Sequence, residues 1–328
     1  MLWALVLAGG EGRRLRSLTV TAGGTPVPKQ FCSLTGGRTL LEDALTRAES
    51  LVPRKRICSV VAQQHRDWWQ ELLAGLPASN VIMQPRNRGT GIGILYPLLQ
   101  IASRDPDAVL ILLPADHYVR DELVLRQALR IAVQRVVQDP AMPVLLGMRP
   151  ERVDPELGYI VPGVPDERGN KVVQRFAEKP STAAAATLIE QGGLWNSFIV
   201  IATAQSLIDM FTLRFAPLVL EMQVIVSRML AGPGVAGWPA VVDLYERLPN
   251  LDFSTDLLED YDNRLRVIEV PPCGWSDLGT PHRVAEALRH IEVPLHDLAH
   301  EPVGRINLHR IMLDRMRAGA SPVDRPGL

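Results

Sequence analysis

The sequence contains little cysteine and almost no net charge. Its three cysteines, Cys32, Cys58 and Cys273, lie far apart and form no Cys-x-x-Cys pair, which argues against a disulfide framework and against a cysteine-based zinc site. We therefore expect free thiols in a reducing compartment. The formal net charge is −1, whereas proteins that bind nucleic acid usually carry a basic excess. Nucleic acid is therefore not the expected partner.

Signals for membranes and for repetitive architectures are also scarce. The apolar stretch at residues 1–8 is too short to cross a bilayer and lacks the positive region of a secretion signal. We find no internal repeat and no low-complexity tract. Apolar residues make up 47% of the 328 residues and charged residues 22%, which is enough for a full hydrophobic core. We expect a soluble cytoplasmic protein with no membrane partner.

Apolar runs of strand length alternate with segments of helix length over the first 150 residues. The runs are apolar on successive residues, which is typical of strands covered on both faces. The expected strands are Leu2–Leu7, Ile57–Ala62, Val81–Gln84, Val109–Leu113 and Val144–Met148, and the expected helices are Thr39–Leu51, Arg66–Ala74, Thr90–Ser103 and Glu122–Gln138. This alternation predicts an α/β fold, a Rossmann-like and mostly parallel sheet with helices on both faces, which binds ligands at the carboxyl ends of its strands.

The pattern changes after residue 150, where shorter extended segments are separated by turns. The expected strands there are Tyr159–Val161, Val172–Phe176, Phe198–Ile201 and Leu265–Val270, and the helices are Thr182–Gln191, Ala204–Phe211 and Leu218–Leu230. We predict one domain over residues 1–290. Its first half, 1–150, binds a nucleotide, and its second half, 151–290, shapes the site for the other substrate. Residues 291–328 form a C-terminal appendage.

The first expected strand runs into a glycine-rich, basic loop. Gly9, Gly10 and Gly12 allow backbone N–H groups to approach an anion, and Arg14 and Lys29 supply positive charge. The loop is neither a Walker A motif nor a dinucleotide fingerprint. Lys29 is the more telling residue, because a lysine in an apolar segment loses its solvation unless an anion meets it. The loop predicts a phosphate site, with a glycine turn that binds nothing as the alternative.

Two aspartates follow expected strands. Asp116 comes after Val109–Leu113, and Asp277 comes after Leu265–Val270. Mg²⁺ prefers one or two carboxylates together with phosphate oxygens, so the two residues and the basic loop predict a metal–triphosphate site. The alternative for each aspartate is the N-cap of the helix that follows it.

Polar residues at other strand ends indicate the remaining parts of a site. Gln84 is placed to contact a base edge, with the backbone of residues 89–91 against the ribose or base. Glu178 and Lys179 suit a phosphorylated polyol, because a carboxylate accepts from hydroxyls and an ammonium attracts phosphate. The alternative for this pair is a solvated surface ion pair. Gly158 and Asn196 provide space for a sugar ring and a hydrogen bond to it.

In this order, over roughly residues 2–290, these segments resemble the sugar-1-phosphate nucleotidyltransferase family, and within it the mannose-1-phosphate guanylyltransferases. Residues 9–15 are similar to the family's Gly-Gly-x-Gly-Thr-Arg-Leu, with Arg13 in place of the threonine. The other matching segments are Pro28–Phe31, Pro114–His117, Phe176–Pro180 and Trp275–Asp277.

The resemblance implies transfer of a nucleotidyl group from GTP, or another NTP, to a sugar 1-phosphate, most simply mannose 1-phosphate, with release of pyrophosphate. It implies Mg²⁺ or Mn²⁺ on Asp116 and Asp277, and catalytic roles for Arg14, Lys29, Asp116 and Asp277. Implied nucleotide-binding residues are Ala8, Gly9, Gly10, Gly12, Arg14, Lys29, Gln84, Arg88, Gly89 and Thr90. Implied sugar-phosphate residues are Gly158, Tyr159, Glu178, Lys179 and Asn196.

Three segments depart from the family pattern. Trp-Asn-Ser-Gly becomes Trp195–Phe198, Arg-Asn-Thr-Ala becomes Arg88–Gly91, and Ser-Ile-Asp-Tyr is echoed only by Leu251–Phe253. A uridylyl-, thymidylyl- or adenylyltransferase acting on glucose 1-phosphate, or a non-catalytic nucleotide-sugar sensor, therefore remains as an alternative. The family's long members carry a cupin domain that this sequence lacks, so we expect no isomerase activity. The sequence leaves a homodimer open.

Overall fold

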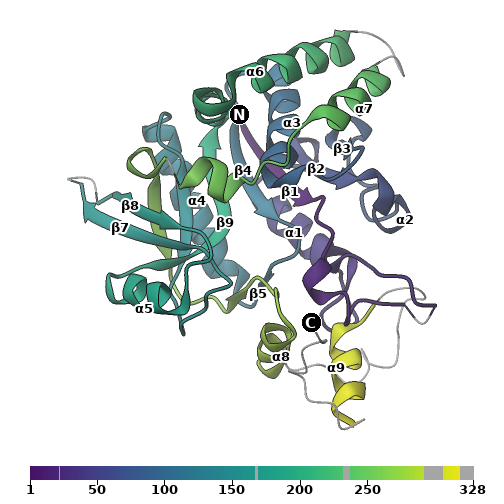
Figure 1. Cartoon of the computed structure of the whole chain (residues 1–328), viewed down its shortest axis with the longest axis vertical. Helices are drawn as coiled ribbons and strands as arrows, with labels where there is room; N and C mark the ends of the chain where they lie inside the picture. The colour runs from purple at the N-terminus through teal and green to yellow at the C-terminus, as the bar shows by residue number, and fades with distance from the viewer. Residues whose placement is uncertain (22, 167–168, 232–236, 260, 292–305, 318–328) are drawn as a thin grey trace.

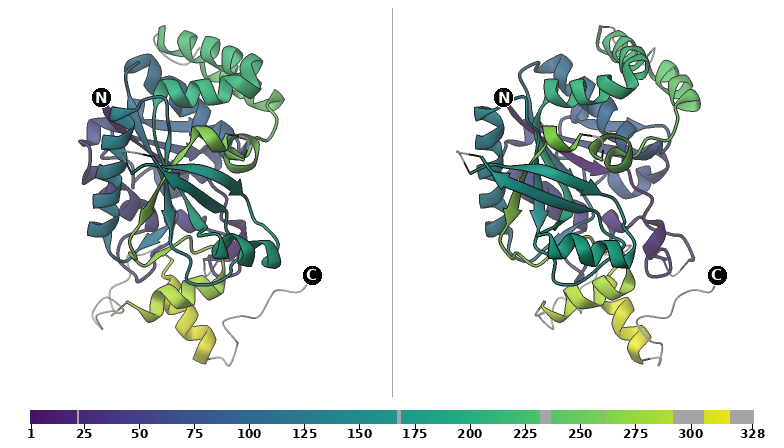
Figure 2. Two further views of the ribbon diagram at one scale, coloured as in Figure 1. Left: turned by 90° about the vertical axis from the view of Figure 1, so that its left-hand side faces the viewer. Right: turned by 60° about the vertical axis from the view of Figure 1, so that its left-hand side comes forward.

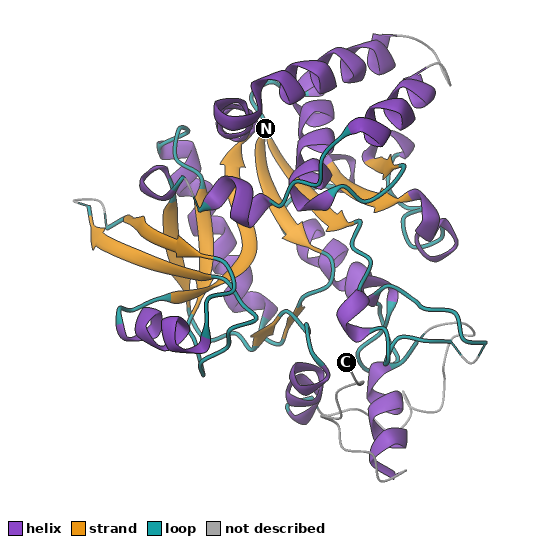
Figure 3. Cartoon of the chain, in the orientation of Figure 1, coloured by secondary structure: helices purple, strands orange, loops and turns teal. Residues whose placement is uncertain are grey.

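A mixed nine-stranded sheet forms the centre of the molecule in the part that the structure describes (Figures 1 and 3). The computed structural model describes residues 1–328 except 22, 167–168, 232–236, 260, 292–305 and 318–328. The strand order is β3-β2-β1-β4-β9-β6-β10-β8-β7. The strands are β1 Leu2–Ala8, β2 Ile57–Ala62, β3 Val81–Gln84, β4 Val109–Pro114, β6 Val144–Met148, β7 Tyr159–Pro165, β8 Lys171–Ala177, β9 Leu194–Thr203 and β10 Arg266–Val270.

The predicted α/β class is confirmed, and most of the parallel pairing lies within residues 1–150. Strands β1 to β4 pair in parallel, and so do β6 and β10. Strand β9 runs antiparallel between β4 and β6, and β8 is antiparallel to both β10 and β7. The second half thus continues the first sheet as expected, mostly through antiparallel pairs but with β10 parallel to β6.

Helices cover both faces of the sheet, and the alternation of side chains along the strands explains why. Along β1, Ala4 and Val6 join a core with α1 and α4, while Leu5 joins a separate core with α3 and α6. The helices are α1 Leu40–Glu49, α2 Arg66–Trp69, α3 Gly89–Arg104, α4 Glu122–Gln138, α5 Thr182–Glu190, α6 Ala204–Ala231, α7 Gly237–Arg247, α8 Pro281–Arg289 and α9 Leu308–Arg317. Helices α6 and α7 lie at the end of the molecule opposite α8 and α9 (Figure 2).

Local sequence signals set several of these boundaries. Thr39 caps α1 in a full capping box with Glu42, which satisfies backbone N–H groups at the helix start. The expected helices Ala204–Phe211 and Leu218–Leu230 form one element, α6, which is interrupted at Phe215 (φ −130°, ψ 36°) just before Pro217. Proline disfavours helical backbone at the residues before it, so the break lies close to where the sequence places it.

Helix α6 is also the one helix in the described part of the chain that combines sufficient length and apolar character to be tested as a membrane span. Residues Ala204–Leu230 are long and apolar enough to cross a membrane by length and composition alone. Leu207, Phe211 and Met222 lie in the core that α6 shares with α3. A core helix passes the same test, so this property is weak evidence for a membrane span.

The last described helix is joined to the N-terminal region. The Ser33 N–H donates to the Ile306 carbonyl (2.8 Å), and the N–H groups of Leu308 and His309 donate to the carbonyls of Ser33 and Leu34. Leu308 is fully buried. The start of α9 is therefore paired with the segment that directly follows the Lys29 turn. The predicted division of the chain at residues 150 and 290 stays a prediction.

Candidate active site

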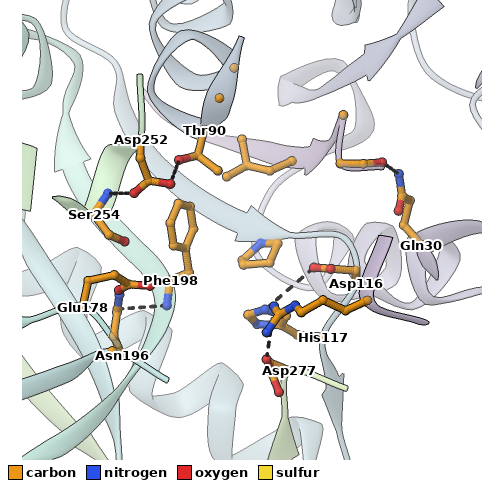
Figure 4. Close-up of a pocket in the computed structure, with 18 of the residues that line it drawn as sticks. Gln30, Thr90, Asp116, His117, Glu178, Asn196, Phe198, Asp252, Ser254 and Asp277 are labelled. Carbon is orange, nitrogen blue, oxygen red and sulfur yellow. Dashed lines mark hydrogen bonds and ion pairs between the residues drawn. The ribbon is translucent and has the colours of Figure 1, made fainter. Parts of the chain in front are cut away.

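A cavity of about 300 Å³ opens where the two halves of the sheet meet, beside the carboxyl ends of β1 and β4 (Figure 4). It brings together most of the sequence-predicted residues. Those that line it are Gly9, Gly10, Arg14, Gln84, Gly89, Thr90, Asp116, Gly158, Glu178, Lys179, Asn196 and Asp277. A neighbouring hollow of about 480 Å³ is lined by Gly12 and Lys29 and shares Arg14, Gly89 and Asp116 with it.

A short ribbon explains how two aspartates so far apart in sequence meet. Strand β5 (Tyr118–Val119) pairs antiparallel with β11 (Trp275–Ser276), with Ser276 opposite Tyr118. Asp116 precedes the first strand and Asp277 follows the second, so the pairing places both at the same end of the ribbon. Neither is a helix cap, because Asp121 caps α4 and Thr280 caps α8. The capping alternatives are therefore wrong.

Lys29 connects the two aspartates. Its side chain is only 6% exposed, and its Nζ lies 2.9 Å from Asp116 Oδ2 and donates to the Asp277 carbonyl. The anion that compensates for its lost solvation is thus supplied by the chain itself. Burial alone would raise the pKa of the Asp116 carboxyl, but the attraction of Lys29 holds that pKa below its usual range. Asp116 is therefore ionised at neutral pH.

Arg14 lies at the mouth of the cavity with loose contacts. Its side chain is 52% exposed, with one terminal nitrogen 3.9 Å from Asp277 Oδ2 and the other 3.6 Å from Glu156. Both distances exceed those of a hydrogen bond. The guanidinium therefore keeps donors available for an anion in the cavity.

Asp277 also has a buried cationic neighbour that sequence reasoning missed. Arg283, on α8, is 4% exposed; its Nε lies 2.9 Å from Asp277 Oδ1, and its Nη1 donates to Asp154 (2.8 Å). The Gly279 N–H donates to the same Asp277 oxygen. No signal in the sequence marks Arg283, because an arginine on an amphipathic helix ordinarily lies in solvent.

The two carboxylates fit a divalent cation that also binds phosphate. Asp116 Oδ1 and Asp277 Oδ2 have only long contacts among the described residues, 3.7 Å to His117 and 3.9 Å to Arg14. No group of three or more His, Cys, Asp or Glu residues that could hold a metal occurs in the described part. Two carboxylates without a full cage are typical of Mg²⁺ shared with substrate phosphates.

His117, next to Asp116, is a neutral neighbour. Burial lowers the pKa of His117 to about 4, so its imidazole is uncharged near neutral pH. Its ring packs edge-on against Trp275, with ring centroids 5.4 Å apart. This agrees with the interpretation of His117 as a structural histidine.

The glycine loop is held in shape by Gln30. Its side-chain amide donates to the carbonyls of Ala8 (2.9 Å) and Gly10 (2.8 Å). A Cβ on Gly9 would lie 2.2 Å from the Gln84 side chain, whereas one on Gly10 would meet open space. A side chain at position 9 would therefore displace the Gln84 amide, and Gly10 borders free volume where an anion can approach. Ala8 itself is buried and contributes only backbone.

Gln84 and Thr90 also line the cavity, Thr90 beside its acidic end. Gln84 is buried, and its Oε1 has no hydrogen-bond partner among the described residues. The Thr90 hydroxyl donates to Asp252 (3.2 Å) and accepts from the Phe253 N–H (2.8 Å). Arg88 does not line the cavity: its guanidinium donates to the carbonyls of Tyr245 and Glu246 on α7. Its side chain thus anchors α7.

The opposite end of the cavity is acidic. Glu178 is half-buried against Gly158, where an added Cβ would lie 2.5 Å from its carboxylate. Burial raises the pKa of Glu178, and nearby Lys179 opposes the rise. Lys179 Nζ lies 3.6 Å from Glu178, and its backbone has φ 43°. A bulky residue at positive φ is uncommon and concentrates at ligand sites.

Tyr159 is the sugar-site residue that the structure places elsewhere. It is fully buried, its hydroxyl donates to the Asp154 carbonyl (3.1 Å), and it accepts from Trp195. The strand alternation explains this: on β7, Tyr159 points into the core while the preceding Gly158 borders the cavity.

The sequence matches a known protein family over most of its length. Residues 3–293 match the family model described as Nucleotidyl transferase. The chain belongs to this family. It is 30% identical over 208 residues to the xanthan biosynthesis protein XanB of Xanthomonas campestris pv. campestris (strain ATCC 33913), which covers 62% of the chain and 43% of XanB. It is 28% identical over 287 residues to a mannose-1-phosphate guanylyltransferase of Escherichia coli, covering 85% of the chain and 58% of that protein.

Solved structures agree with this assignment. A Thermus thermophilus protein titled mannose-1-phosphate geranyltransferase superposes with a TM-score of 0.73 at 29% identity, covering 88% of the chain and 80% of that protein. The expected resemblance to sugar-1-phosphate nucleotidyltransferases, with mannose-1-phosphate guanylyltransferases among the relatives, is confirmed. The chain spans about half the length of the curated relatives that it matches.

The nucleotidyl transferase cavity also contains residues that sequence reasoning did not select. Asp252 and Ser254 line its acidic end, together with Phe198, and Asn87 and Glu156 line its mouth. In sequence, the segment Leu251–Phe253 is only a weak echo of a family motif. Its position beside Thr90 follows from long-range pairing with α3, in which the Gly91 N–H donates to the Leu251 carbonyl (2.8 Å).

Proposed function

We propose that the protein transfers a nucleotidyl group from an NTP to a sugar 1-phosphate and releases pyrophosphate, with GTP and mannose 1-phosphate as the favoured pair. One observation carries the proposal: a single cavity is lined at one end by Arg14, Asp116 and Asp277, and at the other by Glu178 and Lys179. The first group suits a triphosphate and the second a phosphorylated sugar. The relatives named mannose-1-phosphate guanylyltransferase support the choice of substrates.

The reaction needs positioning and charge neutralisation more than covalent help from the protein. A phosphate oxygen of the sugar 1-phosphate attacks the α-phosphorus of the nucleotide, the bond to the β-phosphate oxygen breaks, and pyrophosphate leaves in line. Lys179 binds the sugar's phosphate, and Glu178 and Asn196 accept and donate hydrogen bonds to its ring hydroxyls. Arg14 and the glycine-loop N–H groups stabilise the negative charge on the departing pyrophosphate.

Asp116 and Asp277 would hold Mg²⁺ or Mn²⁺, which would supply a positive charge to neutralise the phosphate oxygens. Lys29 fixes the position of the Asp116 carboxylate through its 2.9 Å contact and holds the Asp277 backbone at the same time. Lys29 therefore acts in two ways: it holds Asp116 and Asp277 in a fixed position relative to each other, and it contributes its positive charge.

The proposal is tested by measuring pyrophosphate release. Each of four NTPs is combined with mannose 1-phosphate or glucose 1-phosphate, with Mg²⁺ and then with EDTA in excess. We expect the highest kcat/KM for GTP with mannose 1-phosphate, and no release in EDTA. A maximum with another pair would reassign the substrates to the uridylyl, thymidylyl or adenylyl alternative. Binding of NTP without turnover for any pair would instead indicate a sensor.

Lys179→Ala should raise the KM for the sugar phosphate by about 10-fold or more, because a charged hydrogen bond contributes about 1.5–3 kcal/mol. The KM for the NTP should stay within about 2-fold of wild type, because the glycine loop and Gln84 lie at the other end of the cavity. Initial-rate kinetics with each substrate varied in turn measure both constants. Lys171→Ala, on β8 outside the cavity lining, is the matched control. An effect confined to the NTP would reverse the assignment of the two ends.

A further inference from the structure

The acidic end of the cavity contains an aromatic side chain that the sequence analysis did not select. Phe198 lines this end together with Glu178, Asn196, Asp252 and Ser254. Figure 4 shows its ring between the Glu178–Asn196 pair and the Asp252–Ser254 pair. Its ring is only partly buried, so one side of it is available to a ligand. An apolar surface among hydrogen-bonding groups is the arrangement that recognises a ring by packing as well as by polar contacts.

A β-bulge turns Phe198 into the cavity. Strand β9 pairs Val200 with Leu145 and Asn196 with Gly147 of β6. The chain therefore advances four residues on β9 while it advances two on β6, and Phe198 lies in the extra segment. Bulges of this kind redirect a side chain and are frequent beside active sites. Phe198 lines the cavity together with Asn196 but, unlike Asn196, has no paired residue on β6.

The bulge holds Phe198 in a conformation that phenylalanine rarely adopts. Its φ is 59°, in the left-handed region where Cβ meets the backbone. The Asn196 side chain accepts from the Phe198 N–H (3.0 Å), and the Ser197 hydroxyl donates to the Leu146 carbonyl (2.6 Å). These hydrogen bonds hold Phe198 in this conformation. The conformation strains phenylalanine, whereas glycine would adopt it without strain.

A second phenylalanine fixes where the ring lies. The Phe198 and Phe253 ring centroids are 5.9 Å apart at an interplanar angle of 61°, an edge-to-face geometry that aromatic pairs favour. Phe253 is fully buried and is anchored to Thr90 through its backbone N–H. Phe253 therefore supports the Phe198 ring rigidly, and a larger ligand can displace the ring only by breaking this edge-to-face contact.

We propose that Phe198 is a specificity-determining residue that restricts the second substrate to unsubstituted hexose 1-phosphates and excludes N-acylated ones. This inference rests on the proposed function. The cavity of about 300 Å³ lies at the small end of the range for ligand sites, and the ring occupies space at the end assigned to the sugar. An acetamido group is bulkier than the hydroxyl that it replaces and needs room that the supported ring denies it. The rigid Phe198 ring thus selects against the acetamido group by steric exclusion.

The test compares two sugar 1-phosphates on the same enzyme preparation. We measure kcat/KM for mannose 1-phosphate and for N-acetylmannosamine 1-phosphate, which differ only in the acetamido group, with wild type, Phe198→Gly and Phe198→Tyr, and we measure their Kd values by calorimetry. Because both sugars are compared on one preparation, a partly unfolded fraction cancels from the ratio. Phe198→Gly also suits the positive φ, and Phe198→Tyr keeps the ring as the matched control.

We expect wild type and Phe198→Tyr to prefer the unsubstituted hexose strongly. We expect Phe198→Gly to lower this preference by about 10-fold or more, the range of one lost steric contact, with an unchanged KM for the NTP. Equal use of the two sugars by wild type, or a ratio unchanged in Phe198→Gly, would overturn the inference. If no sugar 1-phosphate turns over, the proposed reaction fails, while the ratio of the two Kd values still decides whether Phe198 selects between them.

Discussion

Replacing Arg14 with alanine should lower kcat by about 10²–10³, because preorganised charge stabilisation of a transition state has this magnitude. The melting temperature should stay within about 1 °C of wild type, because an exposed side chain with loose contacts adds little to stability. Arg14 is half-exposed, and its described ionic contacts are no shorter than 3.6 Å. Removing the guanidinium therefore costs the folded protein almost no stability, whereas the departing pyrophosphate loses a positive charge beside it.

Arg13 provides the matched control for this experiment. It is adjacent in sequence, it is more exposed, and it pairs with Glu11 on the surface, outside the main cavity. Steady-state pyrophosphate release and thermal unfolding of Arg13→Ala should both match wild type. Near-native turnover in Arg14→Ala would show that this arginine does not act on the reacting phosphates.

Asp277→Ala should lose both turnover and stability. The lost carboxylate should lower kcat by about 10²–10³ if it holds the catalytic cation. It should also lower the free energy of unfolding, by at most about 3–5 kcal/mol, because it removes one of the two carboxylates that neutralise a buried guanidinium. That charge is Arg283, which is 4% exposed and lies 2.9 Å from Asp277. Urea unfolding and pyrophosphate release measure the two losses separately.

A double variant separates the two roles of Asp277. In Asp277→Ala/Arg283→Met the buried guanidinium is replaced by an apolar chain, so more than half of the lost stability should return. Asp154, which Arg283 also contacts, keeps a second arginine, Arg152, at 3.5 Å. Turnover should stay as low as in the single variant. Recovery of turnover along with stability would mean that Asp277 serves the fold alone.

The sequence predicted the parallel half of the fold closely because its signals are local. Successive apolar residues bounded by turns placed β2, β3 and β6 at their observed ends, and Thr39 marked the start of α1. Such signals depend on a few adjacent residues. The lengths of β9 and α6 were underestimated, because the bulge at Phe198 and the break at Phe215 interrupt patterns that the fold nevertheless continues.

The candidate site was predictable to the extent that its residues lie at strand ends. Asp116 follows a strand, and Asp277 follows a strand and a short turn, so a sheet-based argument brought them together. Arg283 and Asp252 escaped detection because their positions depend on which distant segments pack together. Arg88 and Tyr159 were selected on motif position, but the register of α3 and β7 directs their side chains into the protein.

The backbone pairing of residues 306–309 with Ser33 and Leu34 makes the lysine-bearing turn a composite of early and late parts of the chain. During synthesis, Lys29 emerges long before the residues that pair with the neighbouring N–H and carbonyl groups. In a protein cut at residue 290, the Ser33 N–H would lose its partner, the Ile306 carbonyl. The apolar surface that Leu308 covers would be exposed. The segment that directly follows the Lys29 turn thus completes its backbone hydrogen bonds only when the last described helix has docked.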